Sequence, residues 1–211
     1  MIYLGVDVAG ASNTWVAGLA PEADGLRVCL EPQLRSLQEI VETCVADPVV
    51  AGGIDGHLTT SLSAETGFRA SDRRLRSLLP PDCRNWVSSL NSLMAVPIRG
   101  QLLAQHLAPL VGTVLETHPR ASLLFALGDE AEGAVRAYKS GGQAGQRAIE
   151  TLWEAWAAQF QITVQDVPQT DGALDALVCA TTVHLYHHRP QALLHLQEDE
   201  AVRGWGPFCV L

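Results

Sequence analysis

Four acidic residues of this chain occupy positions where packing alone does not favour a charge. Three of them end apolar runs of strand length, and the fourth interrupts a small, apolar helical pattern. The four are Asp7, Asp55, Glu116 and Asp175. Because an isolated carboxylate in an apolar environment is costly, each needs a partner, a proton or a metal. Hard divalent cations take oxygen ligands, so these residues predict a metal site if the fold brings them together.

Asp7 also has a plain structural explanation. It precedes the turn signal Ala-Gly-Ala-Ser-Asn at 9–13, and Asp side chains often accept hydrogen bonds from turn amides. This stretch by itself leaves both interpretations of Asp7 open.

The segments around these acids predict a mixed sheet. Three apolar runs joined by short turns predict an antiparallel meander, and they lie at 2–8, 14–20 and 25–30. A helical pattern that starts at Pro32 leads to a further run at 49–55, and this strand–helix–strand order predicts a parallel neighbour. If that strand lies beside the first, Asp7 and Asp55 emerge at one edge. Their charges then repel unless a proton or cation lies between them.

The rest of the chain completes an α/β pattern of a mixed central sheet flanked by helices. The run at 112–116 predicts another strand, and helical patterns occupy 97–109, 119–127, 129–142, 143–160 and 171–188. The chain has 211 residues, of which 47% are hydrophobic and 18% charged, as is typical of a globular protein. We expect a single domain over 1–211, with a loop–helix insertion around 56–110.

Arginines gather in the segment at 69–79, which carries four of them within eight residues. One interpretation is a solvated helix face on which Asp72 pairs locally. The other is a phosphate-contacting patch at the mouth of the site.

Two further polar residues lie near the candidate ligands. His118 follows the strand that ends at Glu116, where a metal ligand, an orienting group or an ordinary hydrogen-bonded neighbour would each fit. Asp171 lies four residues before Asp175 on the same helix face, and it also suits the N-cap of that helix.

The composition restricts the partners. A formal net charge of −9 argues against avid, nonspecific binding to nucleic acid, although a local basic patch or a metal-bridged contact is compatible with it. No apolar run reaches membrane-spanning length, so we expect a cytoplasmic protein with no membrane partner. The five cysteines form no C-x-x-C pair, which predicts reduced thiols. The oligomeric state stays open, a homodimer included.

An ordered set of short motifs resembles the domain of unknown function 429 family of predicted RNase H-like nucleases. The motifs cover nearly the whole chain, and they are GVDVAGASNTW at 5–15, GIDGHL at 53–58, GFRASDRRLR at 67–76, ETHPRASL at 116–123, DGALDALVCA at 171–180 and GWGPF at 204–208. Each motif alone is weak, and the ordered set is more specific. The family commonly has a proline two residues after the second Asp, where this sequence has His57.

The resemblance implies an RNase H-like fold, in which carboxylates from the central strand, the next strand and a late helix hold divalent metals. It also implies a nuclease that hydrolyses phosphodiester bonds with two Mg²⁺ or Mn²⁺ ions about 4 Å apart. In that scheme Asp7 bridges the two metals, and Asp55, Asp175 and Glu116 complete the ligands.

The same resemblance assigns supporting roles to four other residues. Arg69 and Arg73 would neutralise the substrate phosphate, which belongs to a nucleic acid or to another phosphate ester. His118 and Asp171 would contact the metal ligands, rather than the metal, and orient them.

Two other classes of function stay open. One is an ATP-binding phosphotransfer protein of the sugar-kinase and actin type, which shares this sheet but usually needs two such domains. The other is a non-catalytic binding protein that kept the RNase H-like fold, because a fold does not determine a function.

Overall fold

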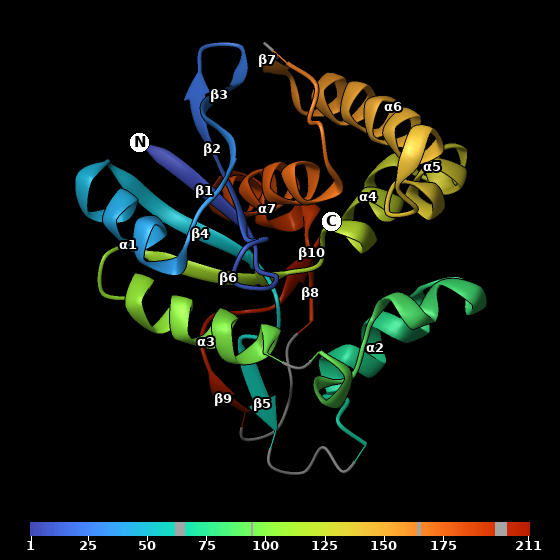
Figure 1. Ribbon diagram of the computed structural model, residues 1–211, viewed down its shortest axis with the longest axis horizontal. Helices are drawn as coiled ribbons and strands as arrows, with labels where there is room; N and C mark the ends of the chain where they lie inside the picture. The colour runs from blue at the N-terminus through green and yellow to red at the C-terminus, as the bar shows by residue number, and fades with distance from the viewer. Residues whose placement is uncertain (62–65, 94, 164–165, 197–201) are drawn as a thin grey trace.

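The first strand, β1 (Ile2–Asp7), lies inside a mixed six-stranded sheet in the computed structural model of the chain (Figure 1). The structure describes residues 1–61, 66–93, 95–163, 166–196 and 202–211. The other strands of this sheet are β2 (Trp15–Glu22), β3 (Gly25–Leu34), β4 (Val49–Asp55), β6 (Thr113–Thr117) and β7 (Ile162–Thr163). Their order across the sheet is β6-β4-β1-β2-β3-β7.

The pairing of these strands confirms the predicted mixed sheet. β1, β2 and β3 form an antiparallel meander, β4 runs parallel to β1, and β6 runs parallel to β4. In this register Asp7 pairs with Asp55, and Asp55 pairs with Thr117. Glu116 instead pairs with Ile54. Because side chains alternate along a strand, Asp7, Asp55 and Thr117 share one face and Glu116 belongs to the opposite face.

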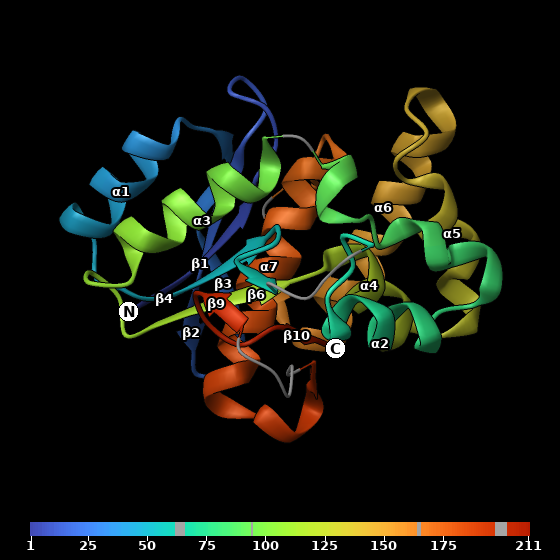
Figure 2. The same ribbon diagram turned by 90° about the horizontal axis from the view of Figure 1, so that it is seen from below.

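Helices cover both faces of the sheet (Figures 1 and 2). On one face, α1 (Leu37–Ala46) and α3 (Val96–Leu107) share a buried apolar core with β1 and β4. The other face carries α7 (Asp171–His188), and the helices packed behind it are α4 (Pro119–Leu127), α5 (Glu132–Ala137) and α6 (Gly142–Phe160). Among the described residues, no helix is both long and apolar enough to cross a membrane.

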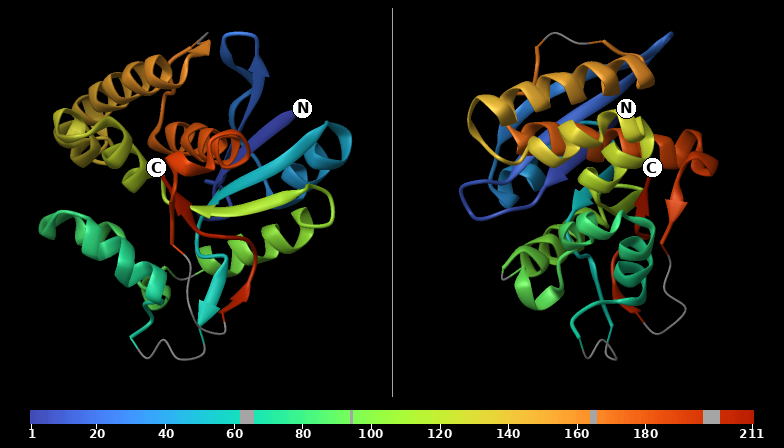
Figure 3. Two further views of the ribbon diagram at one scale, coloured as in Figure 1. Left: turned by 180° about the vertical axis from the view of Figure 1, so that it is seen from behind. Right: turned by 90° about the vertical axis from the view of Figure 1, so that its right-hand side faces the viewer.

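Shorter elements complete the fold. Helix α2 (Ala70–Leu78) lies away from the sheet, and the 3-10 helices are η1 (Pro81–Trp86), η2 (Leu90–Ser92), η3 (Asp129–Ala131) and η4 (Pro190–Ala192). Two small antiparallel pairs join β5 (Thr59–Ser61) to β9 (Val202–Gly204) and β8 (Leu194–His195) to β10 (Cys209–Val210). The chain end with β10 returns to the middle of the molecule (Figure 3), where Phe208 forms a β-bridge with Glu116.

Two predicted helix boundaries are wrong. Pro32 lies within β3, and α1 instead begins after Ser36, whose hydroxyl accepts a hydrogen bond from the amide of Glu39 in a capping box. The segment predicted as one helix at 129–142 is divided between η3 and α5. Gly141 and Gly142 then adopt positive φ angles of 71° and 62°, which glycine tolerates better than other residues.

Glycines allow α7 to lie directly on the central strands. A Cβ atom at Gly5 would stand 1.9 Å from the carbonyl oxygen of Ala176, and one at Gly53 would stand 2.6 Å from that of Cys179. Gly5 and Gly53 are register partners on β1 and β4, so together they form a flat strip for the helix backbone.

We expect Gly5→Ala to lower the free energy of unfolding by about 3 kcal/mol, because the added methyl group meets the backbone of α7 rather than a movable side chain. Chemical denaturation followed by circular dichroism would measure the change. Gly52→Ala is the matched control, since its Cβ would meet only the Leu107 side chain, at an ordinary 3.6 Å. Equal effects of the two substitutions would contradict this account of helix packing.

Candidate metal centre

Three of the four predicted carboxylates meet at one point of the structure. One carboxylate oxygen each of Asp7, Asp55 and Asp175 lies within 4.8 Å of the others. Asp7 and Asp55 end the neighbouring parallel strands β1 and β4, and Asp175 comes from the second turn of α7. Asp175 is fully buried, whereas Asp7 and Asp55 are half-buried. We call these three residues the carboxylate cluster.

The electrostatics of the carboxylate cluster favour neutralisation by a proton or a cation. Burial raises the pKa of Asp7 well above its usual range, and the charges of Asp175 and Asp55 raise it further. Burial, followed by the charge of Asp175, raises the pKa of Asp55 to about 7. Burial also raises the pKa of Asp175. A divalent cation at this position would offset the repulsion among the three carboxylates, which adds to the effect of burial.

Lys139 and Tyr138 bind the innermost carboxylate. The Lys139 ammonium donates to Oδ2 of Asp175 at 2.5 Å, and the Tyr138 hydroxyl donates to Oδ1 at 3.0 Å. Burial alone would lower the pKa of Lys139, but the charge of Asp175 raises it above its ordinary value. Lys139 therefore remains charged and supplies one positive charge to the carboxylate cluster.

Sequence reasoning missed Lys139. Its only signal was its place beside Tyr138, just before the double glycine that ends the α5 segment. Its proximity to Asp175 depends on how α5 packs near α7, and no local pattern reports that packing.

Asp171 lies at the edge of the carboxylate cluster. It is the first residue of α7, its side chain is 48% exposed, and its carboxylate is 3.5 Å from the Lys139 ammonium. The predicted N-cap role belongs to Thr170 instead, whose hydroxyl accepts from the amide of Ala173 at 3.2 Å. Asp171 thus orients Lys139 rather than capping the helix.

Glu116 does not join the carboxylate cluster. It lies on the opposite face of the sheet, where its side chain is 3% exposed and forms a two-point ion pair with the Arg69 guanidinium. Its Oε2 atom also accepts a hydrogen bond from the amide of Leu58 at 2.8 Å. With these partners, Glu116 acts as a structural anchor, and the structure does not support its predicted role as a metal ligand.

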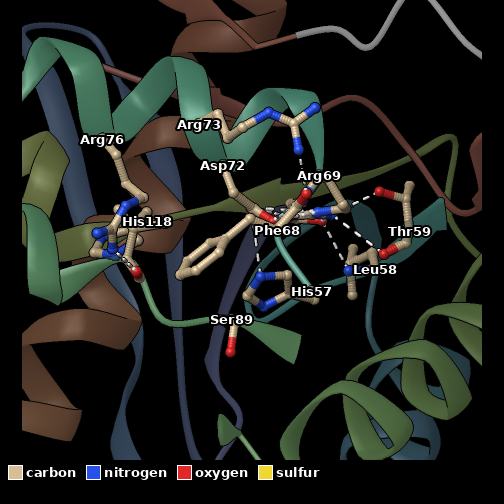
Figure 4. A network of polar contacts seen from close by, with 12 residues as sticks. His57, Leu58, Thr59, Phe68, Arg69, Asp72, Arg73, Arg76, Ser89 and His118 are labelled. Carbon is tan, nitrogen blue, oxygen red and sulfur yellow. Dashed lines mark hydrogen bonds and ion pairs between the residues drawn. The ribbon is translucent and has the colours of Figure 1, made fainter. Parts of the chain in front are cut away.

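Arg69 also has a structural role, because its guanidinium is held by buried partners (Figure 4). It is 1% exposed, and besides Glu116 its guanidinium binds Asp72 at 2.7 Å and the Thr59 hydroxyl at 2.6 Å. Asp72 pairs locally, as one interpretation of this arginine-rich segment expected, but both side chains are buried, so the pair does not lie on a solvated helix face. Arg69 is therefore not free to bind a substrate phosphate. Arg73 is exposed and donates to the carbonyl of Phe68 at 2.6 Å.

His118 caps a helix. Its Nδ1 accepts from the amide of Ala121 at 3.3 Å at the start of α4, and its Nε2 lies 3.3 Å from the carbonyl of Trp86 (Figure 4). Burial lowers the pKa of His118 to about 4, so the ring is neutral at pH 7. Both ring nitrogens are thus engaged away from the carboxylate cluster.

A pocket of about 240 Å³ adjoins the carboxylate cluster. Asp55 and Lys139 contribute to its lining, together with His57, Trp86 and Arg120. The lining also includes apolar side chains, such as Val96 and Phe208, and the ion-paired side chains of Arg69, Asp72 and Glu116. A ligand in this pocket would therefore lie beside two members of the charged site.

The chain matches no family model, no curated protein and no solved structure in comparisons with each. Its own side chains are therefore the guide to its chemistry. They provide three close carboxylates, a lysine that neutralises one of them, and a pocket that opens beside Asp55.

Proposed function

We propose that this protein is a divalent-metal-dependent hydrolase of phosphodiester bonds, of the nuclease type. The observation that carries the proposal is the convergence of three carboxylate oxygens within 4.8 Å, from two adjacent strand ends and one helix. The mixed sheet with its meander and parallel strands agrees with an RNase H-like fold, and the motif resemblance to the domain of unknown function 429 family points the same way. The fold family and the resemblance both remain predictions.

The residues present fit Mg²⁺ or Mn²⁺. All three donors are carboxylate oxygens, which hard divalent cations prefer, and burial raises the pKa of each of them, so a cation would replace a proton at the site. Asp7, Asp55 and Asp175 would hold the ion. When bound, such an ion supplies a Lewis acid and lowers the pKa of a coordinated water.

The side chains around the ion would orient the ligands and the substrate. Asp175 is held in one orientation by Tyr138 and Lys139, so its free lone pairs have a defined direction. Lys139 is 35% exposed and lines the pocket, where its charge attracts a substrate phosphate. The pocket walls exclude part of the solvent and orient the ester beside Asp55.

A non-catalytic binding protein is the second candidate, and one observation favours it. The ammonium of Lys139 already neutralises the innermost carboxylate, so the metal-free site carries an internal counter-ion. In this case the pocket would bind a phosphate ester without cleaving it.

Titration of the protein with Mn²⁺ by calorimetry, followed by assays with bis(p-nitrophenyl) phosphate and a single-stranded oligonucleotide, tests the proposal. We expect saturable Mn²⁺ binding and hydrolysis that stops when a chelator removes the metal. If the folded protein shows neither Mn²⁺ binding nor metal-dependent hydrolysis, the proposed function is refuted. Metal binding with no cleavage of either substrate would favour the second candidate.

The affinity for Mn²⁺ should fall as the pH is lowered through about 7, the raised pKa of Asp55. Burial is the main cause of that pKa, and a bound metal has to displace the proton. For each proton that the metal must displace, the Mn²⁺ affinity falls by about ten-fold for each unit that the pH drops below this pKa. Calorimetry between pH 5.5 and 8.5 would measure the trend, and a constant affinity would contradict it.

The stability of the metal-free protein should change with pH in the opposite sense. Because the folded pKa of Asp55 lies above the ordinary value of 3.8, protonation favours the folded state. This contribution is fully present below about pH 4 and is lost as the pH rises through about 7. The free energy of unfolding of an Asp55→Asn protein should lack this pH-dependent contribution.

A further inference from the structure

We infer that the pocket beside the carboxylate cluster binds a single nucleotide unit, with the base between His57 and Trp86 and the phosphate toward Asp55 and Lys139. This inference deepens the proposed function and takes its reaction from it. It makes the substrate a nucleotide at the end of a single strand or in a nucleotidyl ester, rather than the interior of a duplex.

The size of the pocket limits the ligand. Its volume of about 240 Å³ is smaller than the roughly 300–1,000 Å³ of pockets that take drug-sized molecules. A nucleoside-sized group fits this space, whereas two stacked base pairs do not. The walls are also mixed in character: Leu93, Val96 and Phe208 are apolar, and the charged lining residues include Asp55, Lys139, Arg69, Asp72 and Glu116.

His57 supplies a polar atom that needs a partner. The residue is 8% exposed, and its Nε2 atom has no hydrogen-bond partner among the described residues. The atom lies 3.4 Å from Oδ1 of Asp72, which is an ion pair only if the ring is protonated (Figure 4), and Arg69 also binds that carboxylate. A buried polar atom without a hydrogen bond is costly, so a ligand that offers one gains affinity. The polar edge of a nucleobase is such a ligand.

Trp86 supplies a flat wall of the pocket that is held in a fixed position. The guanidinium of Arg120 lies over its indole ring at 4.0 Å from the centroid. Arg120 is itself fixed, because it donates to the carbonyls of Val135 at 3.2 Å and Arg136 at 3.0 Å. An aromatic side chain in a fixed position suits stacking by a nucleobase, and stacking tolerates every base because each has a π-face.

The positions of Asp55, His57 and Lys139 indicate where the phosphate and the base of the ligand would lie. Asp55 belongs to the carboxylate cluster and His57 lies two residues later, so one tight loop carries both the metal ligand and the base-facing group. The ammonium of Lys139, which also lines the pocket, lies at the carboxylate end. A phosphate at this end would contact Lys139, and a base at the other end would contact His57 and Trp86.

The test compares two nucleotides with a sugar phosphate that has no base. Calorimetry with the Mn²⁺-loaded protein would measure binding of thymidine 5′-monophosphate, adenosine 5′-monophosphate and ribose 5-phosphate. We expect both nucleotides to bind at least ten-fold more tightly than ribose 5-phosphate. We expect His57→Ala and Trp86→Leu each to weaken nucleotide binding about ten-fold, while ribose 5-phosphate binding and the Mn²⁺ isotherm stay unchanged. Arg74→Met, at an exposed position of α2, is the control variant.

Several outcomes would overturn the inference. Equal affinity for ribose 5-phosphate and the nucleotides would show that the base is not recognised. Unchanged nucleotide binding in both pocket variants would place the nucleotide elsewhere. Absence of nucleotide binding to the folded, Mn²⁺-loaded protein would refute the assignment outright.

The failure of this inference is distinguishable from failure of the proposed function. If the protein binds no Mn²⁺ yet binds nucleotides through His57, the proposed function fails and the nucleotide pocket stands. If Mn²⁺ binding and hydrolysis are present but covalently closed duplex circles are cut as fast as single-strand ends, the proposed function stands and the nucleotide-unit inference fails.

Discussion

Replacement of Arg69 by methionine is expected to lower the free energy of unfolding by about 3–5 kcal/mol, or to prevent folding altogether. The guanidinium is 1% exposed, so methionine would fill most of the space but leave two buried carboxylates without a cation. Breaking one side of a buried ion pair costs far more than removing an exposed charge, because the abandoned carboxylates stay desolvated.

Arg73→Met on the same helix is the matched control for Arg69→Met. Arg73 is exposed, so its loss should change the free energy of unfolding by no more than about 0.5 kcal/mol. Urea denaturation of both proteins measures the difference. If Arg69→Met were as stable as Arg73→Met, the network of Arg69, Asp72 and Glu116 would not be an anchor of the fold.

Asp7→Asn should reduce metal-dependent hydrolysis by about 10³-fold, equivalent to about 4 kcal/mol of transition-state stabilisation. The substitution keeps the shape of the side chain but removes one of three negative charges that would hold the cation. Calorimetric Mn²⁺ binding should weaken in parallel. The metal-free variant should be as stable as the wild type or more stable, because one like charge is removed from the carboxylate cluster.

Asp171→Asn provides the control for Asp7→Asn. It removes an equal charge from the same neighbourhood, but its side chain is 48% exposed and contacts only the edge of the site at Lys139. Hydrolysis should change less than ten-fold. Normal activity in Asp7→Asn, or equal losses in the two variants, would rule out the carboxylate cluster as the reactive centre.

Much of the sheet and the core of the site could be predicted from the sequence. The short turns after β1 and β2 predict antiparallel pairing, and the helix before β4 predicts that β4 runs parallel to β1. This order of strands places Asp7 beside Asp55. Asp175 could be predicted because a charge within a small, apolar helical segment has few structural reasons to exist. These inferences depended on local patterns and on general rules of strand connection.

The assignments that failed depended on register and on tertiary packing. Glu116 ends an apolar run as Asp55 does, but β6 extends one residue further, so Thr117 takes the position beside Asp55. A shift of one residue turns a side chain to the other face of a sheet. Lys139 meets Asp175, and Arg69 meets Glu116, only when α5, α2 and β6 have packed, and no local pattern in the sequence indicates those two contacts.

The glycine strip on β1 and β4 explains how the carboxylate cluster keeps its shape. Because Gly5 and Gly53 have no Cβ atom, the α7 backbone at Ala176 and Cys179 lies directly against β1 and β4. Asp175 is therefore held at a set distance from Asp7 and Asp55 before any ligand arrives. The repulsion among the three acids is overcome during folding, and little conformational entropy remains to be lost on binding. The site is thus pre-organised by residues that have no side chain at all.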